Sequence, residues 1–350
     1  MVRSVFPMSQ HPHQTGPVIR TQGLTKTFTR HKKTVEAVRG LDLEVGAGEL
    51  VAFLGPNGAG KSTTLRMLTT LIPPTAGTAE VAGYDVVRSR REVRRSIGYV
   101  GQGNAAGHTQ RGRDELVSQA RAFGMSRRDA RRRADELLEA FDLTEHAGRP
   151  VSTLSGGQRR RLDVAIGLVH TPRLLFLDEP STGLDPQNRA NLQEQIKRLH
   201  TEQDTTIVLT THYLEEADAI ADRVVVIDHG LVIADDTAPA LKSGLGDLVT
   251  LGFDDEPQAI TAAGLAVARL ATGAVVGRSG TTVTIRAARG AEIAPRLVQD
   301  LAGLRAPVQR MEVIGPTLDD VFLDLTGRSL RETNEATEPT ESTETEGAAA

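Results

Sequence analysis

The stretch Glu49-Leu-Val-Ala-Phe-Leu-Gly-Pro-Asn-Gly-Ala-Gly-Lys-Ser62 decides the fold. After Glu49 it begins with a continuous apolar run, Leu50–Leu54, which is typical of a strand buried in a parallel sheet. Gly55–Ser62 then follows the pattern G-x-x-x-x-G-K-S, and the residues from Thr63 onward are predicted to form a helix. A glycine-rich turn between a buried strand and a helix is the context in which this pattern holds phosphates. The sequence therefore predicts a phosphate loop, Gly55–Ser62, in an α/β domain.

Each residue type in the phosphate loop has a chemical reason. Glycines at positions 55, 58 and 60 allow backbone conformations that turn successive N–H groups toward one anion. The helix that follows adds the positive end of its dipole. Lys61 can reach the β- and γ-phosphates of a nucleotide, and Ser62 can ligate Mg²⁺. The plainer interpretation, a glycine turn before a helix and nothing more, is disfavoured by the strand–loop–helix context.

Two carboxylates, Asp178 and Glu179, follow a second buried-strand run at Leu174–Leu177. Open α/β sheets present ligands at the carboxyl ends of their strands, where this pair lies. Because successive strand residues point to opposite sides, Asp178 can support Mg²⁺ while Glu179 polarises the water that attacks a γ-phosphate. Such a pair alone is more often a strand end that meets solvent. The phosphate loop upstream favours the catalytic interpretation.

A second helix N-terminus follows Leu154-Ser-Gly-Gly-Gln158. Ser155 with Gln158 matches the capping box S-x-x-Q, so Ser155 is predicted to be the N-cap. Gly156 and Gly157 would leave bare amides at the positive end of this helix, which makes it a candidate second anion site. From the residues alone, a well-capped helix without a ligand is an equally good interpretation.

The apolar pattern also divides the chain into segments. Residues 18–243 alternate short apolar runs with helical periodicity, which predicts a doubly wound α/β domain. Residues 244–328 are predicted to form a second, small α/β domain, with strands in GDLVTLGF, TTVTIRA and VQRMEVI and helices in EIAPRLVQDLAGL and TLDDVFLDLTG. The polar residues 1–17 and the acidic, Thr/Glu-rich residues 329–350 are expected to be disordered.

Composition excludes several classes of function. The 350 residues contain no cysteine, which excludes disulfide scaffolds, thiolate metal sites and cysteine catalysis. No apolar stretch is long enough to span a membrane and no secretory signal is visible, so we expect a cytoplasmic protein. The net charge is −4, of which residues 331–350 carry −5, leaving +1 for the rest. This balance, with Phe123 the one aromatic residue among the eight arginines of residues 111–133, argues against a nucleic-acid partner.

Together these residues resemble the ATP-binding cassette family, the nucleotide-binding subunits of ABC transporters. Gly55–Ser62 resembles its Walker A loop, Leu154–Gln158 is identical to its LSGGQ signature, and Leu174–Glu179 resembles its Walker B strand with the catalytic glutamate. Four further positions match family motifs in order and spacing, namely Phe28 as the adenine-stacking aromatic, Gln102 as the Q-loop glutamine, Asp185 as the D-loop aspartate and His212 as the switch histidine. The family more often has tyrosine at the position of Phe28.

The resemblance implies an α/β fold of the P-loop NTPase type, with a parallel-sheet core, an antiparallel β subdomain and an α-helical subdomain, followed here by the small C-terminal α/β domain. It implies an ATPase that uses ATP and Mg²⁺, with Glu179, His212 and Gln102 as catalytic residues and Ser62, Gln102 and Asp178 at the metal. The residues that it places on ATP are Phe28, Gly55, Pro56, Asn57, Gly58, Ala59, Gly60, Lys61, Ser62, Thr63, Ser155, Gly156, Gly157, Gln158 and Asp185.

The family also implies partners. Its cassettes pack in pairs, head to tail, so that the signature of one subunit caps the ATP bound on the phosphate loop of the other. One copy of each motif in this chain therefore implies a second copy of the chain. Because the chain contains no channel, the resemblance also implies a separate integral-membrane permease.

A narrower resemblance concerns three segments, Leu154–Arg161, Asp185–Arg189 and Gly315–Gly327, which are similar to the daunorubicin-resistance type of cassette. Those subunits carry a C-terminal accessory domain and pair with an ABC-2-type permease. This implies efflux of a drug, an antibiotic or another amphiphile, with the chain bound peripherally at the cytoplasmic side of the cell membrane. The alternative is a non-transport ATPase of the same family that remodels a soluble complex; the single cassette and the short spacing between Walker A and the signature favour transport.

Overall fold

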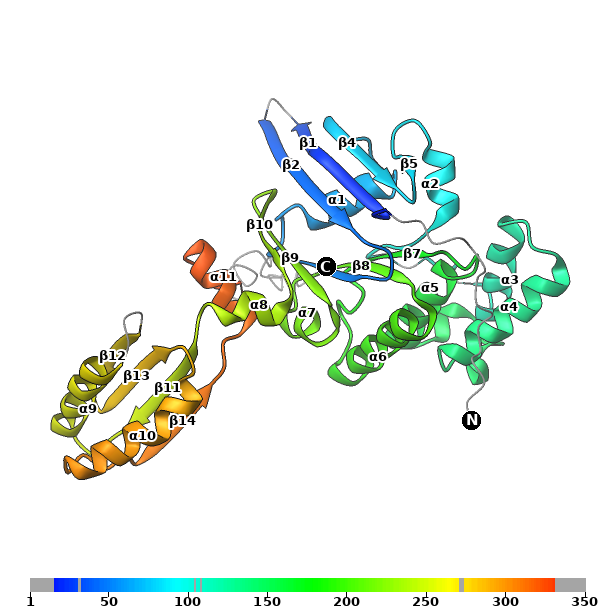
Figure 1. The fold of residues 1–350 in the computed structure, drawn as a ribbon. Coiled ribbons are helices and arrows are strands. Elements are labelled where there is room, and N and C mark those ends of the chain that lie inside the picture. Colours follow the sequence, from blue (N-terminus) through cyan, green and yellow to red (C-terminus); the bar gives the residue numbers. More distant parts are fainter. Residues whose placement is uncertain (1–15, 31–32, 104, 108, 271–273, 331–350) are drawn as a thin grey trace, which may run out of the picture. The chain divides into compact units, whose positions relative to one another are not determined.

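The computed structural model describes residues 16–30, 33–103, 105–107, 109–270 and 274–330 (Figure 1). They divide into two compact units, one ending at Asp235 and the other beginning at Asp236. The second unit therefore begins earlier than the expected boundary after Ser243. The reason is that helix α8 (Ala238–Ser243) packs against helix α11 (Leu318–Thr326) of the second unit.

A six-stranded sheet forms the centre of the first unit, in the order β10-β9-β3-β8-β7-β6. The strands are β3 (Leu50–Leu54), β6 (Ile97–Val100), β7 (Leu174–Asp178), β8 (Thr206–Thr211), β9 (Arg223–Asp228) and β10 (Leu231–Asp236). Strands β9, β3, β8, β7 and β6 run parallel to one another. Every residue of β3, β7 and β8 is buried. Burial on both faces explains why β3 and the first four residues of β7 are continuous apolar runs rather than alternating ones, whereas β8 has threonines at both ends.

The register of this sheet brings the predicted motifs to one edge. Leu54, the last residue of β3, pairs with Thr211 of β8, and Asp178 of β7 pairs with Thr210. The phosphate loop leaves β3 at this edge and enters helix α1 (Lys61–Leu68). Parallel strands thus place the phosphate loop, the acidic pair and the end of β8 side by side, at the position where open α/β sheets bind ligands.

Two further parts complete the first unit. An antiparallel sheet, in the order β2-β1-β4-β5, contains β1 (Ile19–Arg30), β2 (Lys33–Val45), β4 (Ala76–Val81) and β5 (Tyr84–Asp85), and helix α2 (Arg90–Ser96) follows it. Its buried residues share one hydrophobic core with Val51 and Phe53 of β3. A helical segment lies between β6 and β7, with α3 (Gly112–Ala122), α4 (Arg127–Ala140), the short 3₁₀ turns Thr144–His146 and Val151–Thr153, and α5 (Gly156–Gly167). Helices α6 (Pro186–Gln203) and α7 (Leu214–Ile220) follow β7 and β8.

The second unit has its own four-stranded antiparallel sheet, in the order β12-β13-β11-β14, and its own hydrophobic core. Its elements are β11 (Asp247–Gly252), α9 (Glu256–Arg269), β12 (Val275–Ser279), β13 (Thr282–Ala287), α10 (Gly290–Gly303), β14 (Arg310–Ile314) and α11. Three of the strands and two of the helices lie where the sequence predicts them. Helix α9 and strand β12 were not expected.

Packed structure continues to the last residue described. Leu330 is buried, and its N–H donates to Oδ1 of Asp319 at 3.0 Å, while the hydroxyl of Ser329 also donates to Asp319. These two residues therefore belong to the second unit rather than to a disordered tail. Residues 1–15 and 331–350, for which disorder is expected, lie outside the described residues. Among the described residues no helix is both long and apolar enough to cross a membrane.

Candidate nucleotide-binding site

The phosphate loop wraps tightly because its glycines meet two different demands. Gly58 and Gly60 have φ angles of 80° and 109°, in the region that favours glycine. Gly55 does not have a positive φ, so the expectation that all three glycines act through backbone conformation was wrong for this one. A Cβ at Gly55 would instead collide with the carbonyl group of Ile227 on β9. Gly55 is required by close packing of two backbones.

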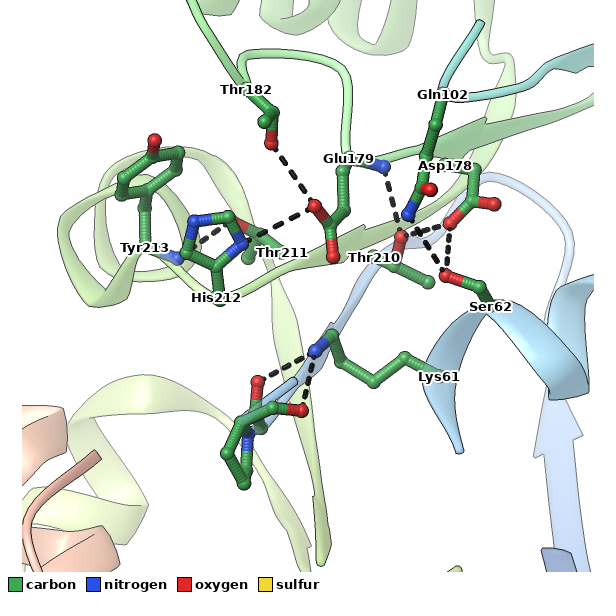
Figure 2. Close-up of polar contacts among 12 residues, drawn as sticks. Lys61, Ser62, Gln102, Asp178, Glu179, Thr182, Thr210, Thr211, His212 and Tyr213 are labelled. Carbon is green, nitrogen blue, oxygen red and sulfur yellow. Dashed lines mark hydrogen bonds and ion pairs between the residues drawn. The ribbon is translucent and has the colours of Figure 1, made fainter. Parts of the chain in front are cut away.

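Lys61 lies inside the curve of the loop (Figure 2). It is 3% exposed, and its Nζ donates to the carbonyl oxygens of Gly55 at 2.7 Å and Pro56 at 3.0 Å. Burial lowers the pKa of Lys61 from 10.5 to about 8, although the negative charges of Glu179 and Asp178 act in the opposite direction. A cation held this way among backbone carbonyls is suited to pair with an incoming phosphate.

Ser62, Asp178 and Gln102 meet beside the loop, as the sequence predicts (Figure 2). Oγ of Ser62 donates to Oδ1 of Asp178 at 2.7 Å, and Nε2 of Gln102 donates to Oγ of Ser62 at 3.2 Å. Thr210 of β8 also donates to Oδ1 of Asp178, at 2.8 Å. The other carboxylate oxygen, Oδ2, is buried and has no hydrogen-bond partner among the described residues.

These three side chains fit a magnesium ion. Mg²⁺ prefers oxygen ligands and is commonly held by one or two carboxylates together with substrate phosphates. The unpartnered Oδ2 of Asp178 is an acceptor without a donor, which is costly in a buried position unless a ligand satisfies it. Gln102 turns its amide nitrogen to Ser62 here, and a rotation of that amide would present its Oε1 instead.

Glu179 follows Asp178 and is held in an unusual conformation. Its φ angle is 47°, in the left-handed region that residues other than glycine, asparagine and aspartate seldom occupy. Its N–H donates to Oγ1 of Thr210 at 2.9 Å, which fixes the turn after β7. Left-handed residues of this kind cluster at functional sites, where the surrounding structure holds them in place.

The carboxylate of Glu179 faces His212, which directly follows β8 (Figure 2). Nδ1 of His212 lies 3.4 Å from Oε2 of Glu179, near the outer limit of a hydrogen bond, and Thr182 donates to the same oxygen at 3.1 Å. Burial by itself would raise the pKa of Glu179, but His212 and the charge of Lys61 outweigh it, and the pKa lies below its usual value. Glu179 is therefore ionised at neutral pH, as a proton acceptor must be.

The signature segment forms the predicted capping box. Oγ of Ser155 accepts from the N–H of Gln158 at 3.2 Å, and Oε1 of Gln158 accepts from the N–H of Ser155 at 2.9 Å. None of the hydrogen bonds described for these two residues reaches the phosphate loop of the same chain. Gly157 instead packs so closely against Asn188 on α6 that a Cβ there would overlap that side chain. Asn188 in turn donates to Asp185, which caps α6.

Phe28 lies on β1 and is exposed. It is opposite Val35 of β2, another exposed apolar residue, and Nζ of Lys26 lies 5.1 Å from the centre of its ring. Two residues after Val35, the carbonyl of Ala37 lies so close to Gly60 that a Cβ there would not fit. Strand β2 thus runs past the phosphate loop and carries Val35, the β2 member of the apolar pair, two residues before this contact.

The structure adds residues that the sequence analysis missed. Thr210 touches both carboxylate residues, and Arg160 and Asp163 on α5 hold the backbone around Gln102 and Glu179. The signal for Thr210 was available, because polar residues at the end of a buried strand are unusual. The two residues of α5 gave no signal, since charged residues at helical spacing ordinarily face solvent.

The family model described as ABC transporter matches residues 38–182. The daunorubicin resistance ATP-binding protein DrrA2 of Streptomyces coeruleorubidus is 42% identical over 327 residues, which cover 91% of this chain and 98% of that protein. The chain belongs to the ABC transporter family. This cassette is also 34% identical over 317 residues to the linearmycin resistance ATP-binding protein LnrL of Bacillus subtilis, covering 90% of the cassette and 100% of the relative.

Solved cassettes confirm the predicted P-loop NTPase fold. The cbiO1 protein from Clostridium perfringens, part of the ABC transporter complex cbiONQ, matches with a TM-score of 0.59 and 26% identity over 65% of this cassette and 90% of that chain. A dimeric ATP-binding cassette in a post-hydrolysis state, bound to ADP and phosphate, matches with a TM-score of 0.58 and 26% identity over 63% of this cassette and 98% of that chain. The cassette is an ATPase, as the resemblance implied.

Proposed function

We propose that this cassette is the ATP-hydrolysing subunit of an exporter that removes a drug, an antibiotic or another amphiphile from the cell. One observation carries the proposal: the similarity to a daunorubicin resistance ATP-binding protein extends over 91% of the chain, including the second unit, and not only over the nucleotide site. The linearmycin resistance relative points to the same class of substrate. On this proposal the first unit is the ATP-binding domain and the second is an accessory domain.

The residues around the phosphate loop have different roles in ATP hydrolysis. Lys61 and the loop amides hold the β- and γ-phosphates, and the exposed pair of Phe28 and Val35 offers an apolar face for adenine. Glu179 orients and polarises the attacking water, and His212 holds the carboxylate of Glu179 from the side.

Asp178, Ser62 and Gln102 would hold Mg²⁺ next to the phosphates. When bound, the ion would neutralise negative charge that develops on the phosphate oxygens. The orphaned Oδ2 of Asp178 is the observation that supports this assignment.

A second copy of the chain would complete each site. Helix α5 begins with Gly156 and Gly157, so their amides lie at the positive end of its dipole, which suits an anion. In the proposed head-to-tail dimer, Ser155, Gly156, Gly157 and Gln158 contact the ATP bound by the partner, with Asp185 beside them. The solved relative bound to ADP and phosphate is a dimer, which supports this arrangement.

A separate ABC-2-type permease would supply the pathway across the membrane. The cassette would then bind peripherally, at the cytoplasmic side of the cell membrane. Helices α3 and α4 carry most of the arginines of residues 111–133 and lie apart from α1, the helix that follows the phosphate loop (Figure 1). We propose that they meet the permease. The cbiO1 relative is itself part of a multi-subunit transporter complex, which supports a partner of this kind.

The test is purification of the full chain from native membranes, followed by mass spectrometry of the proteins that accompany it. A stoichiometric polytopic membrane protein, with ATP hydrolysis by the complex, is the expected result. A soluble partner without any membrane protein would overturn the exporter and favour the alternative, an ATPase that remodels a soluble complex. ATP hydrolysis would stand in either case.

A further inference from the structure

Arg160 lies on α5 but turns inward, away from solvent, and is 8% exposed. Its guanidinium donates to backbone carbonyls on two other segments. Nη1 donates to Gly101 at 2.6 Å, and Nε donates to Pro180 at 2.8 Å. Nη2 donates to Asp178 at 3.1 Å and to Glu179 at 3.3 Å. One side chain therefore joins α5 to the residue before Gln102 and to the turn that contains Glu179.

Asp163 lies one helical turn later on α5 and is 1% exposed. Its Oδ1 accepts from the N–H groups of Ala105 at 3.0 Å and Ala106 at 3.2 Å. Residues three apart on a helix share a face, so Arg160 and Asp163 reach the same neighbouring loop. Arg160 binds that loop before Gln102, and Asp163 binds it after Gln102.

Arg160 donates hydrogen bonds and Asp163 accepts them, which matches the backbone groups that each side chain contacts. A guanidinium can only donate, and it binds carbonyl oxygens; a carboxylate can only accept, and it binds amides. Glu179 is held from two sides by the same logic: Thr210 of β8 accepts from its N–H, and Arg160 of α5 donates to its carbonyl. The left-handed conformation of Glu179 thus depends on two elements that are far apart in sequence.

We propose that Arg160 and Asp163 are positioning residues for ATP hydrolysis, which set the places of Gln102 and Glu179 relative to the signature helix α5. The proposal rests on the roles proposed above for Gln102 and Glu179. Ser155, the N-cap of helix α5, is one of the residues proposed to contact ATP on the partner subunit. The same helix therefore carries the contact with one nucleotide and the support for the residues that act on the other.

Two adjacent arginines, Arg160 and Arg161, provide a matched test. Arg160→Gln removes the four carbonyl contacts, whereas Arg161→Gln removes the same charge one residue along, where the described contact is an ion pair of 3.8 Å with Asp142. For Arg160→Gln we expect kcat to fall at least about tenfold, part of the roughly 10²–10⁴-fold that a positioned base contributes. The KM for ATP should change little, because Lys61 and its loop are untouched. Arg161→Gln should keep both constants.

Asp163 offers a conservative pair. Asp163→Asn keeps a carbonyl oxygen that can accept from Ala105 and Ala106, whereas Asp163→Ala cannot. We expect Asp163→Ala to lower kcat and to raise the Mg²⁺ concentration needed for half-maximal activity, and Asp163→Asn to restore most of both. If Asp163 only stabilised the fold, Asp163→Ala and Asp163→Asn with equal melting temperatures would need the same Mg²⁺ concentration for half-maximal activity.

The variant Glu179→Gln distinguishes two outcomes. Either the positioning role of Arg160 and Asp163 is wrong, or the role proposed for Glu179 is itself wrong. Loss of turnover in Glu179→Gln together with a wild-type kcat in Arg160→Gln would overturn the positioning role and leave the role of Glu179 intact. Turnover that survives Glu179→Gln would overturn the role of Glu179 itself. If Arg160→Gln does not fold, Asp163→Ala and Asp163→Asn decide the question, and equal Mg²⁺ dependence in that pair would overturn the proposal.

Discussion

At the scale of single residues, the site contains two buried polar groups, Lys61 and Asp178, that a nucleotide with its metal would satisfy. The hydrogen bonds described for the buried cation of Lys61 go to neutral carbonyl groups, and Asp178 carries a buried oxygen without a donor among the described residues. Both groups are costly in the free protein and both suit ligands of opposite charge. The free energy released when these groups are satisfied contributes to the affinity for a nucleotide with its metal.

Lys61 makes nucleotide affinity depend on pH. Its pKa is about 8 in the free protein, and a bound phosphate raises it, so the bound state holds more protons above pH 8. Affinity must then fall as the pH rises through that region, by about tenfold between about pH 7 and pH 9. Calorimetry with ADP in two buffers of different ionisation enthalpy should detect proton uptake at the higher pH. Lys61→Arg, which stays charged, should bind with little pH dependence there; a wild-type affinity that is flat across this range would contradict the prediction.

Glu179→Gln tests the proposed base directly. The amide cannot accept a proton from water, so we expect kcat to fall by at least about 10²-fold. ATP binding should persist, because the phosphate loop is unchanged, and the variant should accumulate as an ATP-bound dimer. Phosphate release and size-exclusion chromatography with ATP and Mg²⁺ measure the two effects. An unchanged kcat would remove Glu179 from its role.

Much of the residue-scale site could be predicted from the sequence because each motif borders a strand of the same sheet. Ser62, Gln102 and Asp178 meet as expected once β3, β6 and β7 are parallel neighbours or near neighbours. What could not be predicted is the support behind them. Arg160 makes its contacts through backbone carbonyls, and any residue type has a carbonyl, so no pattern of side chains reveals them.

At the scale of elements, the N-termini of α5 and α6 meet at a point with no spare space. Gly157 of α5 touches Asn188 of α6, and Asn188 binds the N-cap residue Asp185. The signature and the D-loop are therefore packed as one surface within the subunit. Movement of either helix end must displace the other, since close-packed groups shift together rather than deform.

Gly157→Ala should show this packing. The added methyl group forces Asn188 away from Asp185, and we expect a loss of about 1–3 kcal/mol in the free energy of unfolding. Gly156→Ala is the matched control for stability, because nothing lies within 4 Å of its added Cβ. Thermal unfolding of the nucleotide-free chain compares the two. Equal melting temperatures for both variants would contradict the tight contact.

Element prediction succeeded where the apolar pattern was simple and failed where it was not. Strand β3 and the first four residues of β7 are continuous apolar runs, and β11 and β13 alternate. Helix α9 was missed although Asp255 caps it and Pro257 lies in its first turn, which together are a helix-start signal. Its interior is rich in alanine, which forms helices readily but gives a weak amphipathic pattern.

At the scale of the whole molecule, each of the two units has a hydrophobic core of its own. The core of the first unit includes Phe53 and Phe176, and that of the second includes Leu251 and Ile285. The core of the first unit lies between its two sheets, and that of the second unit lies on the sheet of that unit. The phosphate loop and both carboxylates belong to the first unit. The unit boundary escaped sequence analysis because α8 looks like a continuation of the first unit, and only its packing against α11 assigns it to the second.

Because each unit has its own hydrophobic core, we predict that the two units unfold at different temperatures. We expect calorimetry of the full chain to record two transitions, and ADP with Mg²⁺ to raise only the one that belongs to the first unit. At about 100-fold above its Kd, a ligand stabilises its unit by about 2.7 kcal/mol. Lys61→Met should abolish the shift without merging the transitions. A single transition that moves as a whole with ligand would show that the two cores unfold together.

The left-handed backbone of Glu179 also governs how this position can change when selection changes. Glutamine is closest to glutamate in shape but would inherit the same backbone strain. Glycine, asparagine and aspartate enter that conformation more easily. In lineages that have kept ATP binding and given up hydrolysis, drift at this position should therefore lead to those three residues rather than to glutamine. A cassette that no longer hydrolyses ATP would then be recognisable by a residue at this position that suits the left-handed backbone conformation.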